Sequence, residues 1–522
     1  MPLSLHLLPI FIRMAAATAV AVAVAVMTTN HLAFLFFTFV VGFVLFSALL
    51  LLLRKRPWCS CHVCEAYLSS SWAAEFDNLC DWYAHLLRES PTGTIHIHVL
   101  GNTVTANPAN VEYMLRTRFD NFPKGKPFSA LLGDLLGQGI FNVDGDAWRF
   151  QRKMASLALG SVAVRSYAFG IVSDEIRRCL LPLLSSVADR GDGVVDLQDV
   201  FRKFAFDTIC KISFGLDRGC LELSMPMSEF AATFDTASRL SARRGTATAP
   251  VVWKLKRLLN VGSERELKRA IRMINMLAEE VIRQRRKQGF ASSHDLLSRF
   301  MGSVEEEDKY LRDIVISFLL AGRDAVASGL TSFFLLLSRH ADVAAAMRDE
   351  IASVTKGDGD DVVSYERLKE MHYVHAAIYE SMRLFPPVQF DSKFCLEDDV
   401  LPDGTFVSRN TRVTYHPYAM GRMESIWGPD WGEFKPERWL RRGVFTPESL
   451  FKYPVFQAGQ RVCLGKELAM VEMKTVIVSM VSKFDFKVLQ GGRTIKFVPG
   501  LTATISGGVP ARVTRCVSRR LP

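Results

Sequence analysis

The chain has 522 residues, of which 49% are hydrophobic and 23% are charged, and its mean hydropathy is +0.13. This composition supports a large apolar core and excludes disordered, collagen-like and disulfide-framework proteins. The formal net charge is +10, but basic residues lie beside acidic ones, which favours a membrane surface or an acidic partner over nucleic acid. The ten cysteines follow no regular framework, so we expect a reducing, cytosol-facing compartment.

An apolar run from Leu32 to Leu53 predicts a transmembrane helix. A helix of this length, at about 1.5 Å per residue, crosses a hydrocarbon core of roughly 30 Å. The basic residues Arg54 to Arg56 follow directly, so the positive-inside rule places the rest of the chain on the cytosolic side. A buried core helix is the alternative interpretation of this run.

Residues 1–31 form an N-terminal extension of uncertain role. The stretch from Ala15 to Met27 alternates Ala and Val and is short for a membrane span. It is either a re-entrant or signal-like segment or, because Met14 and Met27 are possible start residues, an extension without a physical role.

Residues 54–75 are interpreted as a linker, and they begin with a group of cysteines at Cys59, Cys61 and Cys64, with His62 among them. The spacing is tighter than in the usual zinc sites, and no second pair of ligands follows nearby. Metal binding and reversible palmitoylation beside the membrane both remain open for these thiols.

Residues 76–522 are predicted to form one catalytic domain that is mainly α with a smaller β region. Apolar residues recur at helical spacing in several long stretches, namely Phe76–Glu89, Val164–Leu184, Val200–Ile212, Arg265–Gln288 and Leu311–Leu337. Loops are expected at Gly191–Gly193 and Lys356–Asp361, and a hairpin at Asp403-Gly404. From Pro386 to Trp439 the helical period fails, and so long an irregular stretch is usually functional or held by special contacts.

Two of the predicted helices carry side chains suited to chemistry. Gly322 in the central helix lets that helix approach a ligand closely and lets its backbone open. Asp324 is an acid in an otherwise apolar stretch, although a solvated acid paired with Arg323 is the simpler interpretation. Trp148 and Arg152 share one face of an earlier helix, where core packing is the alternative role for the indole.

The string from Phe456 to Gly465 places Cys463 between glycines, just before a helical run from Lys466 to Met480. The helix dipole and free backbone amides at this position are expected to lower the pKa of the thiol and favour the metal-binding thiolate. Gly459 and Gly465 would admit a flat, bulky ligand, and Arg461 offers a permanent positive charge to an anionic group. A free buried thiol is the alternative for Cys463.

The pattern Phe-x-x-Gly-x-Arg-x-Cys-x-Gly, with Phe456 as its first residue, resembles the haem-binding loop of the cytochrome P450 superfamily. The resemblance extends from about Phe76 to the C-terminus and implies a cytochrome P450 fold with haem b (iron protoporphyrin IX). It makes Cys463 the axial thiolate ligand of the iron. Haem-propionate contacts would come from Arg461, Trp148 and Arg152, and the remaining loop positions at the cofactor are Phe456, Gly459 and Gly465.

Glu380 and Arg383 lie three residues apart on a helix and can pair. The resemblance implies that this pair joins Arg438, from Pro436-Glu437-Arg438-Trp439, to fix the irregular meander beneath the haem. Their implied role is structural.

The same resemblance implies that Asp324 and a following threonine relay protons during oxygen activation, but here Ala325 replaces the threonine. Ser328 as a substitute, a substrate hydroxyl as donor, or a reaction without O₂ are three explanations, and we favour the first two. The third would make the protein a haem-thiolate isomerase or lyase.

The markers Ala321-Gly322-Arg323-Asp324, Phe119 to Lys126 and Phe385 to Lys393 most resemble the plant fatty-acid ω-hydroxylase branch. Gly137 to Asp144 is most similar to members that oxidise jasmonoyl-isoleucine. The resemblance implies a lipid-like carboxylate substrate, surrounded by segments 122–141, 318–321, 387–389 and 501–503. Lys124, Lys126 and Lys393 are candidates to meet its carboxylate, with a solvated loop lysine as the simpler interpretation of each.

The sequence contains no Gly-x-Gly-x-x-Gly nucleotide loop, so NADPH is expected to act only indirectly. The resemblance implies a membrane-bound NADPH-dependent flavoprotein reductase as partner and an endoplasmic reticulum membrane as location. A basic docking face would comprise Arg149, Lys153, Lys452 and Lys466, which as ordinary solvated charges would have no such role.

Overall fold

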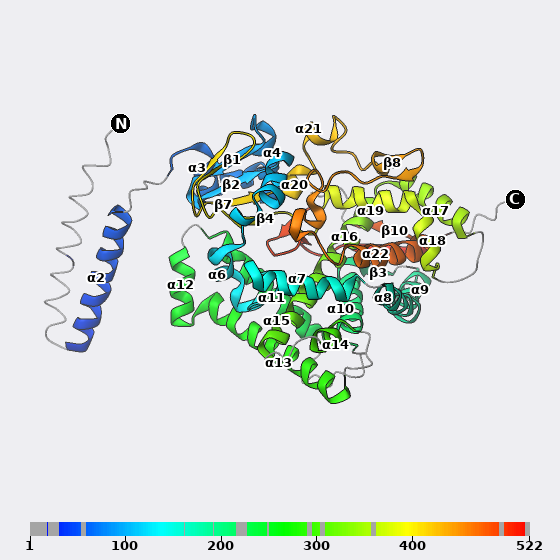
Figure 1. Ribbon diagram of the computed structural model, residues 1–522, viewed down its shortest axis with the longest axis horizontal. Helices are drawn as coiled ribbons and strands as arrows, with labels where there is room; N and C mark the ends of the chain where they lie inside the picture. Colours follow the sequence, from blue (N-terminus) through cyan, green and yellow to red (C-terminus); the bar gives the residue numbers. More distant parts are fainter. Residues whose placement is uncertain are drawn as a thin grey trace. The chain divides into compact units, whose positions relative to one another are not determined.

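The computed structural model describes Thr18 and residues 31–53, 59–160, 162–191, 193–215, 227–247, 250–289, 295–302, 308–355, 362–489 and 495–516 (Figure 1). The chain divides into two compact units, Met1–Glu65 and Ala66–Pro522. The predictions for Arg54–Arg56, Met14, Met27 and the Lys356–Asp361 loop lie outside the described residues. The boundaries predicted for the linker, residues 54–75, and for the catalytic domain, residues 76–522, remain predictions.

The first unit contains helix α2 (His31–Leu53), and helix α3 (His62–Ser69) begins near its end. Phe36 and Phe39 of α2 are each 72% exposed, which is unusual for phenylalanine in a folded domain. By length and apolar composition, one helical stretch of the described chain could cross a membrane: Asp308–Leu337, which is mostly buried. Within α2 the segment Leu35–Ser47 is a shorter apolar helix, so the anchor remains a prediction.

The second unit is mainly helical, as predicted. Its helices before the central stretch are α4 (Leu79–Glu89), α5 (Pro108–Glu112), α6 (Gly125–Leu136), α7 (Gly145–Leu159), α8 (Val162–Glu175), α9 (Leu181–Asp189), α10 (Leu197–Phe214), α11 (Met227–Gly245), α12 (Pro250–Leu259), α13 (Gly262–Gln288) and α14 (Leu296–Met301). Those that follow it are α17 (Ala341–Thr355), α18 (Tyr365–Glu370), α19 (His372–Leu384), α20 (Pro417–Met420), α21 (Glu424–Trp427) and α22 (Lys466–Val481).

The largest sheet has four strands in the order β1 (Thr94–Ile97), β2 (Asn102–Thr105), β7 (Arg412–Tyr415) and β4 (Asp391–Phe394). Only β2 and β7 run parallel within it. A three-stranded sheet has the order β10 (Phe484–Val488), β13 (Pro510–Arg515) and β3 (Val194–Asp196). Three two-stranded ladders are β11 (Phe497–Val498) with β12 (Thr504–Ile505), β5 (Asp399–Val400) with β6 (Phe406–Val407), and β8 (Leu440–Arg441) with β9 (Val444–Phe445). The β5–β6 ladder is the hairpin expected at Asp403-Gly404.

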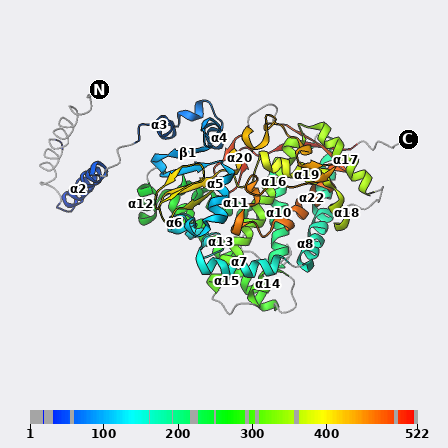
Figure 2. The ribbon, with the colours of Figure 1, turned by 45° about the horizontal axis from the view of Figure 1, so that its top comes forward.

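The central helical stretch comprises α15 (Asp308–Leu319), a π-helical turn η6 (Leu320–Asp324) and α16 (Ala325–Leu337). Residues 326–337 are all buried, which explains why this segment is apolar on every side rather than on one face. In Figures 1 and 2, α10, α16, α19 and α22 lie together, away from β1. The buried apolar side chains of α16, α19 and α22, with those on one side of α10, belong to one apolar core. This core holds in place the helix that follows Cys463 and the helix that carries Asp324.

Candidate active site

The Cys463 loop is held by two 3₁₀ turns, η8 (Pro454–Phe456) and η9 (Gly459–Arg461). The backbone N–H of Cys463 donates to the carbonyl of Phe456 over 2.7 Å, and Gly465 is the residue before the first turn of α22. The backbone N–H of Gly465 also points to the Cys463 sulfur. The loop therefore presents an exposed thiol at the start of a helix, as the sequence predicted.

The direction of the thiol pKa shift differs from the prediction. Burial by the surrounding chain raises the pKa of Cys463, and the opposing contributions of the Gly465 N–H, Arg152 and Lys466 are smaller in sum. A metal ion would reverse this balance, because coordination deprotonates a thiol outright. The helix N-terminus alone does not lower the pKa of Cys463 below its ordinary value here.

The two glycines of this loop were predicted to leave room for a flat ligand, and the structure gives Gly459 a different role. Gly459 has a φ of +61°, and a Cβ added there would collide with the carbonyl of Leu115, in the π-helical turn η3 (Tyr113–Thr117). Gly459 therefore provides a left-handed backbone and close chain packing, not space for a ligand. A Cβ on Gly465 would make only ordinary contact with the Cys463 sulfur at 3.9 Å.

Basic side chains from α7 and the loop converge near the thiol. The Arg461 guanidinium stacks over the Trp148 ring at 4.5 Å and donates to Asp144 over 2.6 Å. Its Nε is buried without a hydrogen-bond partner among the described residues. Arg152 lies close enough to Cys463 for the two charges to interact. An exposed thiol beside a buried, incompletely satisfied arginine fits a metal-bearing anionic cofactor such as haem.

Two lysines predicted as candidates for a substrate carboxylate have another partner. Lys124 and Lys393 are both buried and both pair with Asp391, Lys393 over 2.8 Å. Burial opposes ionisation of Asp391, but the two ammonium groups hold its pKa well below the usual range. Tyr415 adds a hydrogen bond of 3.1 Å. The expectation for these two lysines is therefore wrong, because both are buried on a carboxylate of the folded chain, whereas Lys126 is exposed.

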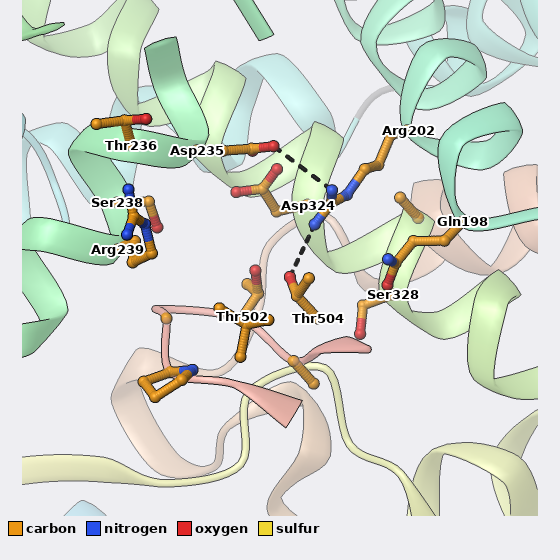
Figure 3. A pocket seen from close by; sticks show the side chains of 15 residues that line it. Gln198, Arg202, Asp235, Thr236, Ser238, Arg239, Asp324, Ser328, Thr502 and Thr504 are labelled. Carbon is orange, nitrogen blue, oxygen red and sulfur yellow. Dashed lines mark hydrogen bonds and ion pairs between the residues drawn. The ribbon is translucent and has the colours of Figure 1, made fainter. Parts of the chain in front are cut away.

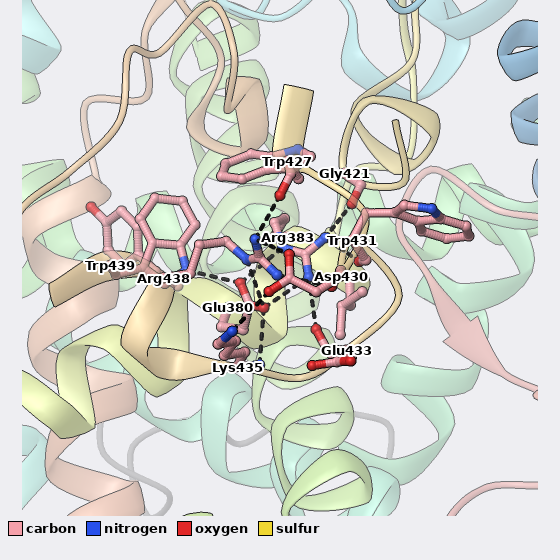
Figure 4. Close-up of polar contacts among 12 residues, drawn as sticks. Glu380, Arg383, Gly421, Trp427, Asp430, Trp431, Glu433, Lys435, Arg438 and Trp439 are labelled. Carbon is pink, nitrogen blue, oxygen red and sulfur yellow. Dashed lines mark hydrogen bonds and ion pairs between the residues drawn. The ribbon is translucent and has the colours of Figure 1, made fainter. Parts of the chain in front are cut away.

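The predicted association of Glu380, Arg383 and Arg438 is present, and Figure 4 shows it. Glu380 and Arg383 have no exposed side-chain surface and form two hydrogen bonds of 2.8 Å, and Arg438 approaches Glu380 at 3.3 Å. The remaining guanidinium N–H groups of Arg383 donate to meander carbonyls, those of Gly421, Trp431 and Glu433. Glu380 also accepts from the Lys435 amide and the Trp439 indole. Every donor of Arg383 is thus used by the protein.

On the central helix, the π-helical turn η6 includes both Gly322 and Asp324. The π-helical turn widens the helix backbone at this point. Gly322, however, packs against the chain itself and not against the expected ligand, because a Cβ added there would collide with the Ile209 side chain of α10. Asp324 pairs with Arg323 over 3.2 Å. Burial raises the pKa of Asp324 to about 6, and Arg323 opposes that shift. A carboxyl with this pKa gains and loses protons near neutral pH.

A cavity of about 210 Å³ adjoins this helix, with Asp324 and Ser328 in its wall (Figure 3). The cavity wall also includes Arg202, Asp235 and Thr504. Arg202 links the other two, because it pairs with Asp235 over 3.5 Å and donates to Thr504 over 2.9 Å. The Ser328 hydroxyl is buried and has no hydrogen-bond partner among the described residues. A polar atom of this kind at a cavity wall suits a bound water.

Sequence reasoning missed Asp235 and Arg202. Asp235 pairs with Arg323 over 2.9 Å from a position 88 residues away in the chain, on the amphipathic helix α11. No motif marks either residue, and only the packing of α10 and α11 against the central helix brings them to Asp324. Asp391 was missed as a functional residue for a related reason, since Lys124 is 267 residues away.

A thiol presented before a helix, cationic side chains around it and a buried helix that opens at an acid together define a thiolate-ligated cofactor site. The sequence model of the family Cytochrome P450 matches residues 85–508. The chain belongs to the cytochrome P450 family.

Curated relatives extend over most of the chain. It is 59% identical over 483 residues to cytochrome P450 94C1 of Arabidopsis thaliana, covering 91% of this chain and 97% of the relative. It is 46% identical to cytochrome P450 94B1 of the same plant, covering 84% and 87%, and 40% identical to cytochrome P450 94A2 of Vicia sativa, covering 85% and 89%. A crystal structure of the cytochrome P450DA heme domain superposes with a TM-score of 0.66 at 21% identity, covering 80% of this chain and 88% of the other, which supports the fold.

Family membership makes this protein a haem-thiolate monooxygenase, as the sequence predicted. The cofactor is haem, and the predicted fold is confirmed.

Proposed function

We propose that the protein hydroxylates the terminal, or ω, carbon of an acyl substrate, in successive steps as far as the carboxylate. The best candidate is jasmonoyl-isoleucine or its hydroxylated form, in jasmonate catabolism, and the alternative is a free fatty acid. Each hydroxylation consumes one O₂ and two electrons with two protons, and yields the alcohol and one water. The second oxygen atom of O₂ leaves as that water, and NADPH supplies the two electrons, so the reaction balances.

The observation that carries this proposal is an apolar wall built from distant segments. Phe128, Phe318 and Leu501 come from three of the four segments predicted to surround the substrate, and all pack, partly exposed, on one apolar cluster. The fourth segment, residues 387–389, lies beside segment 501–503, because the Ala503 N–H donates to the Pro387 carbonyl over 2.8 Å. Partly exposed apolar side chains gathered in this way suit an acyl chain.

Haem, when bound, supplies the O₂ activation that inserts oxygen into a C–H bond. We assign Cys463 as its axial ligand, with Arg461 and Arg152 holding the propionates and Trp148 fixing the Arg461 guanidinium. Phe456 fixes the loop through its carbonyl. Glu380, Arg383 and Arg438 hold the meander that packs beside this loop.

Protons reach the site, in this proposal, through Asp324. Its pKa of about 6 allows it to accept a proton from cavity water and release it toward the reacting centre. Because Ala325 has no hydroxyl, the buried Ser328 hydroxyl binds the water that a threonine would otherwise position. Asp324→Asn is expected to lower kcat by about 100-fold or more, the usual scale for loss of a general acid, with little change in substrate binding.

Electrons come from an NADPH-dependent flavoprotein reductase that docks on the basic face proposed from the sequence. In this face Arg149 pairs with Asp146 over 3.0 Å and Lys452 with Glu448 over 3.4 Å. Arg149, Lys153 and Lys452 are exposed, whereas Lys466 is partly buried. Lys153→Glu should slow reduction more at low salt than at high salt, because surface charges are screened over roughly 10 Å at 0.1 M salt. An effect independent of ionic strength would contradict docking by charge.

We further propose that the apolar segment Leu32–Leu53 anchors the protein in the endoplasmic reticulum membrane as a single pass, with the catalytic domain facing the cytosol. Its apolar composition and the exposed phenylalanines of α2 support this placement. Protease treatment of sealed microsomes should degrade the catalytic domain without detergent. Full protection of that domain would reverse the proposed orientation.

The deciding experiment reconstitutes the haem-loaded protein with reductase and offers jasmonoyl-isoleucine, its hydroxylated form and lauric acid in parallel. Terminal oxidation of jasmonoyl-isoleucine with a higher kcat/KM than that for lauric acid supports the first candidate, and the reverse order supports the fatty-acid alternative.

Omission of NADPH tests the isomerase or lyase alternative, since such a reaction would continue without it. Lys126→Gln, paired with a methyl-ester substrate, tests whether Lys126 meets the carboxylate.

A further inference from the structure

Three cysteine sulfurs lie together outside the haem site. The ligand atoms of Cys59, Cys61 and Cys64 all lie within 4.8 Å of one another, and they form the one such group of three or more His, Cys, Asp or Glu residues found among the described residues. Cys64 is fully buried, whereas Cys59 and Cys61 are partly exposed. Neutral thiols form only weak hydrogen bonds, so nothing in ordinary side-chain polarity requires three of them to meet.

The start of helix α3 explains how the backbone gathers them. The helix begins at His62, so Cys61 immediately precedes it and Cys64 lies in its first turn. The backbone N–H groups of Val63 and Cys64 donate to the Cys61 sulfur, which also contacts the sulfurs of Cys59 and Cys64. Amides directed at a sulfur at a helix N-terminus favour its anionic form. A cation among the three sulfurs would compensate the charge that such an arrangement concentrates.

We propose that Cys59, Cys61 and Cys64 bind one zinc ion through three thiolates, with water as the fourth ligand. Tetrahedral zinc has bonds to sulfur of about 2.3 Å, which places neighbouring sulfurs roughly 3.8 Å apart. The sulfurs now lie within 4.8 Å of one another, so side-chain rotations that move them by about 1 Å bring them to this separation. Binding converts three thiols to thiolates, releases three protons to solvent and transfers no electrons.

Other fates of these thiols fit the geometry less well. Magnesium and calcium prefer oxygen ligands, whereas thiolates select zinc or copper(I). Acylation needs an accessible sulfur, so it could involve Cys59 and Cys61 but not Cys64, which has no exposed surface, and it would give no reason for the three sulfurs to meet. In this proposal zinc ties Cys59, before α3, to the first turn of that helix, without involving the haem site.

The test uses the full-length, haem-loaded protein, purified through a tag that binds no metal and dialysed against zinc-free buffer. Elemental analysis should find about one zinc per haem, because the chain offers one group of three sulfurs among the described residues. Cys61→Ser and Cys64→Ser should each lower the zinc content at least tenfold, as should the triple serine variant. Cys516→Ser, a partly buried cysteine elsewhere, is the matched control and should retain the zinc.

A second measurement counts reactive thiols. The zinc-loaded protein should expose two fewer thiols to a mild alkylating reagent, those of Cys59 and Cys61, than the same sample after a strong chelator, because Cys64 is buried in either state. The reduced, carbon monoxide-treated spectrum should be unchanged in the serine variants, which shows that the haem domain is folded. Absence of zinc from the wild type after incubation with Zn²⁺, copper in its place, or hydroxylamine-sensitive acyl groups on these cysteines would each overturn the proposal.

Discussion

Two arginines with almost no exposed surface, Arg383 and Arg323, have opposite hydrogen-bonding states. Arg383, in the network beneath the Cys463 loop, directs all five of its N–H groups to protein acceptors (Figure 4). Arg323, on the central helix, contacts Asp235 and Asp324 through one nitrogen, and its Nε has no partner among the described residues. Both of its carboxylate partners line the cavity of Figure 3.

The difference separates a scaffold from a working site. A buried charge whose donors are all satisfied fixes one backbone arrangement and has little capacity to respond. A buried charge with donors in excess, beside an acid of raised pKa and a cavity, can exchange partners with water. The two regions should therefore respond differently to substitution: the Arg383 region through stability, and the Arg323 region through pH and coupling.

The largest effect is expected from Arg383→Ala, because it leaves Glu380 charged and buried without its main partner. Breaking a buried pair in this way costs about 3–5 kcal/mol, so the yield of carbon monoxide-binding protein should fall and the part that folds should unfold at lower denaturant concentration. Denaturant unfolding followed by haem absorbance measures it. Arg441→Ala, an exposed arginine on the same meander with its nearest carboxylate at 3.9 Å, should change stability by less than about 0.5 kcal/mol. Equal losses in both variants would contradict the scaffold role.

The second effect is a pH dependence at Asp324. Its folded pKa of about 6 is above the ordinary value of 3.8, so the folded state holds the ionised form at a cost of up to about 3 kcal/mol above pH 6. That cost is relieved as pH falls from 6 to 4, because the folded carboxyl then takes up a proton first. Asp324→Asn should therefore gain stability relative to the wild type as pH rises from 4 to 7. Parallel pH–stability curves for the two proteins would show that Asp324 is not desolvated.

Gly322→Ala tests the packing that lets the central helix open. The added Cβ meets Ile209, a branched side chain with little freedom to withdraw, and overpacking of this kind costs about 1–3 kcal/mol. Ile209→Ala in the same chain should restore much of the loss. Gly170→Ala is the control: that glycine lies within α8 with nothing near its Cβ position, and the change should be neutral or stabilising. Failure of Ile209→Ala to compensate would place the strain elsewhere.

Local sequence spacing predicted what lies within one element. Glu380 and Arg383 are one helical turn apart, and the glycine-flanked Cys463 precedes a helical run, so both could be predicted without a fold. The Asp391–Lys393 contact was also readable in principle, because residues two apart on a strand share a face. The sequence analysis instead offered Lys393 to a substrate carboxylate and gave Asp391 no role beyond the family marker.

Contacts between distant segments were not predictable in this way. Lys124 reaches Asp391, Ile209 fills the space beside Gly322, and Leu115 packs on Gly459. In each case a glycine or a charge was assigned to a ligand, whereas the folded chain itself provides the partner. Sequence alone gives the residue type that a close approach requires, but it does not say which group approaches.

The smallest expected effect distinguishes the two regions most finely, because it concerns one hydroxyl. Ser328→Ala removes a buried oxygen that has no protein partner, so stability should change by less than about 1 kcal/mol, in contrast to Arg383→Ala. Loss of one hydrogen bond to a water on the path to Asp324 corresponds to about 0.5–1.5 kcal/mol, or roughly a two- to tenfold drop in product formed per NADPH consumed.

Ser332→Ala is the matched control for this variant, since Ser332 is buried on the same helix one turn later and does not line the cavity. Its ratio of product to NADPH should stay at the wild-type value. Ala325→Thr in the Ser328→Ala background adds a hydroxyl near Asp324 and should recover part of the lost coupling. If Ser328→Ala and Ser332→Ala behave alike, the protons arrive by a route that does not use this cavity, and the unpaired hydroxyl is only a packing feature of the buried helix.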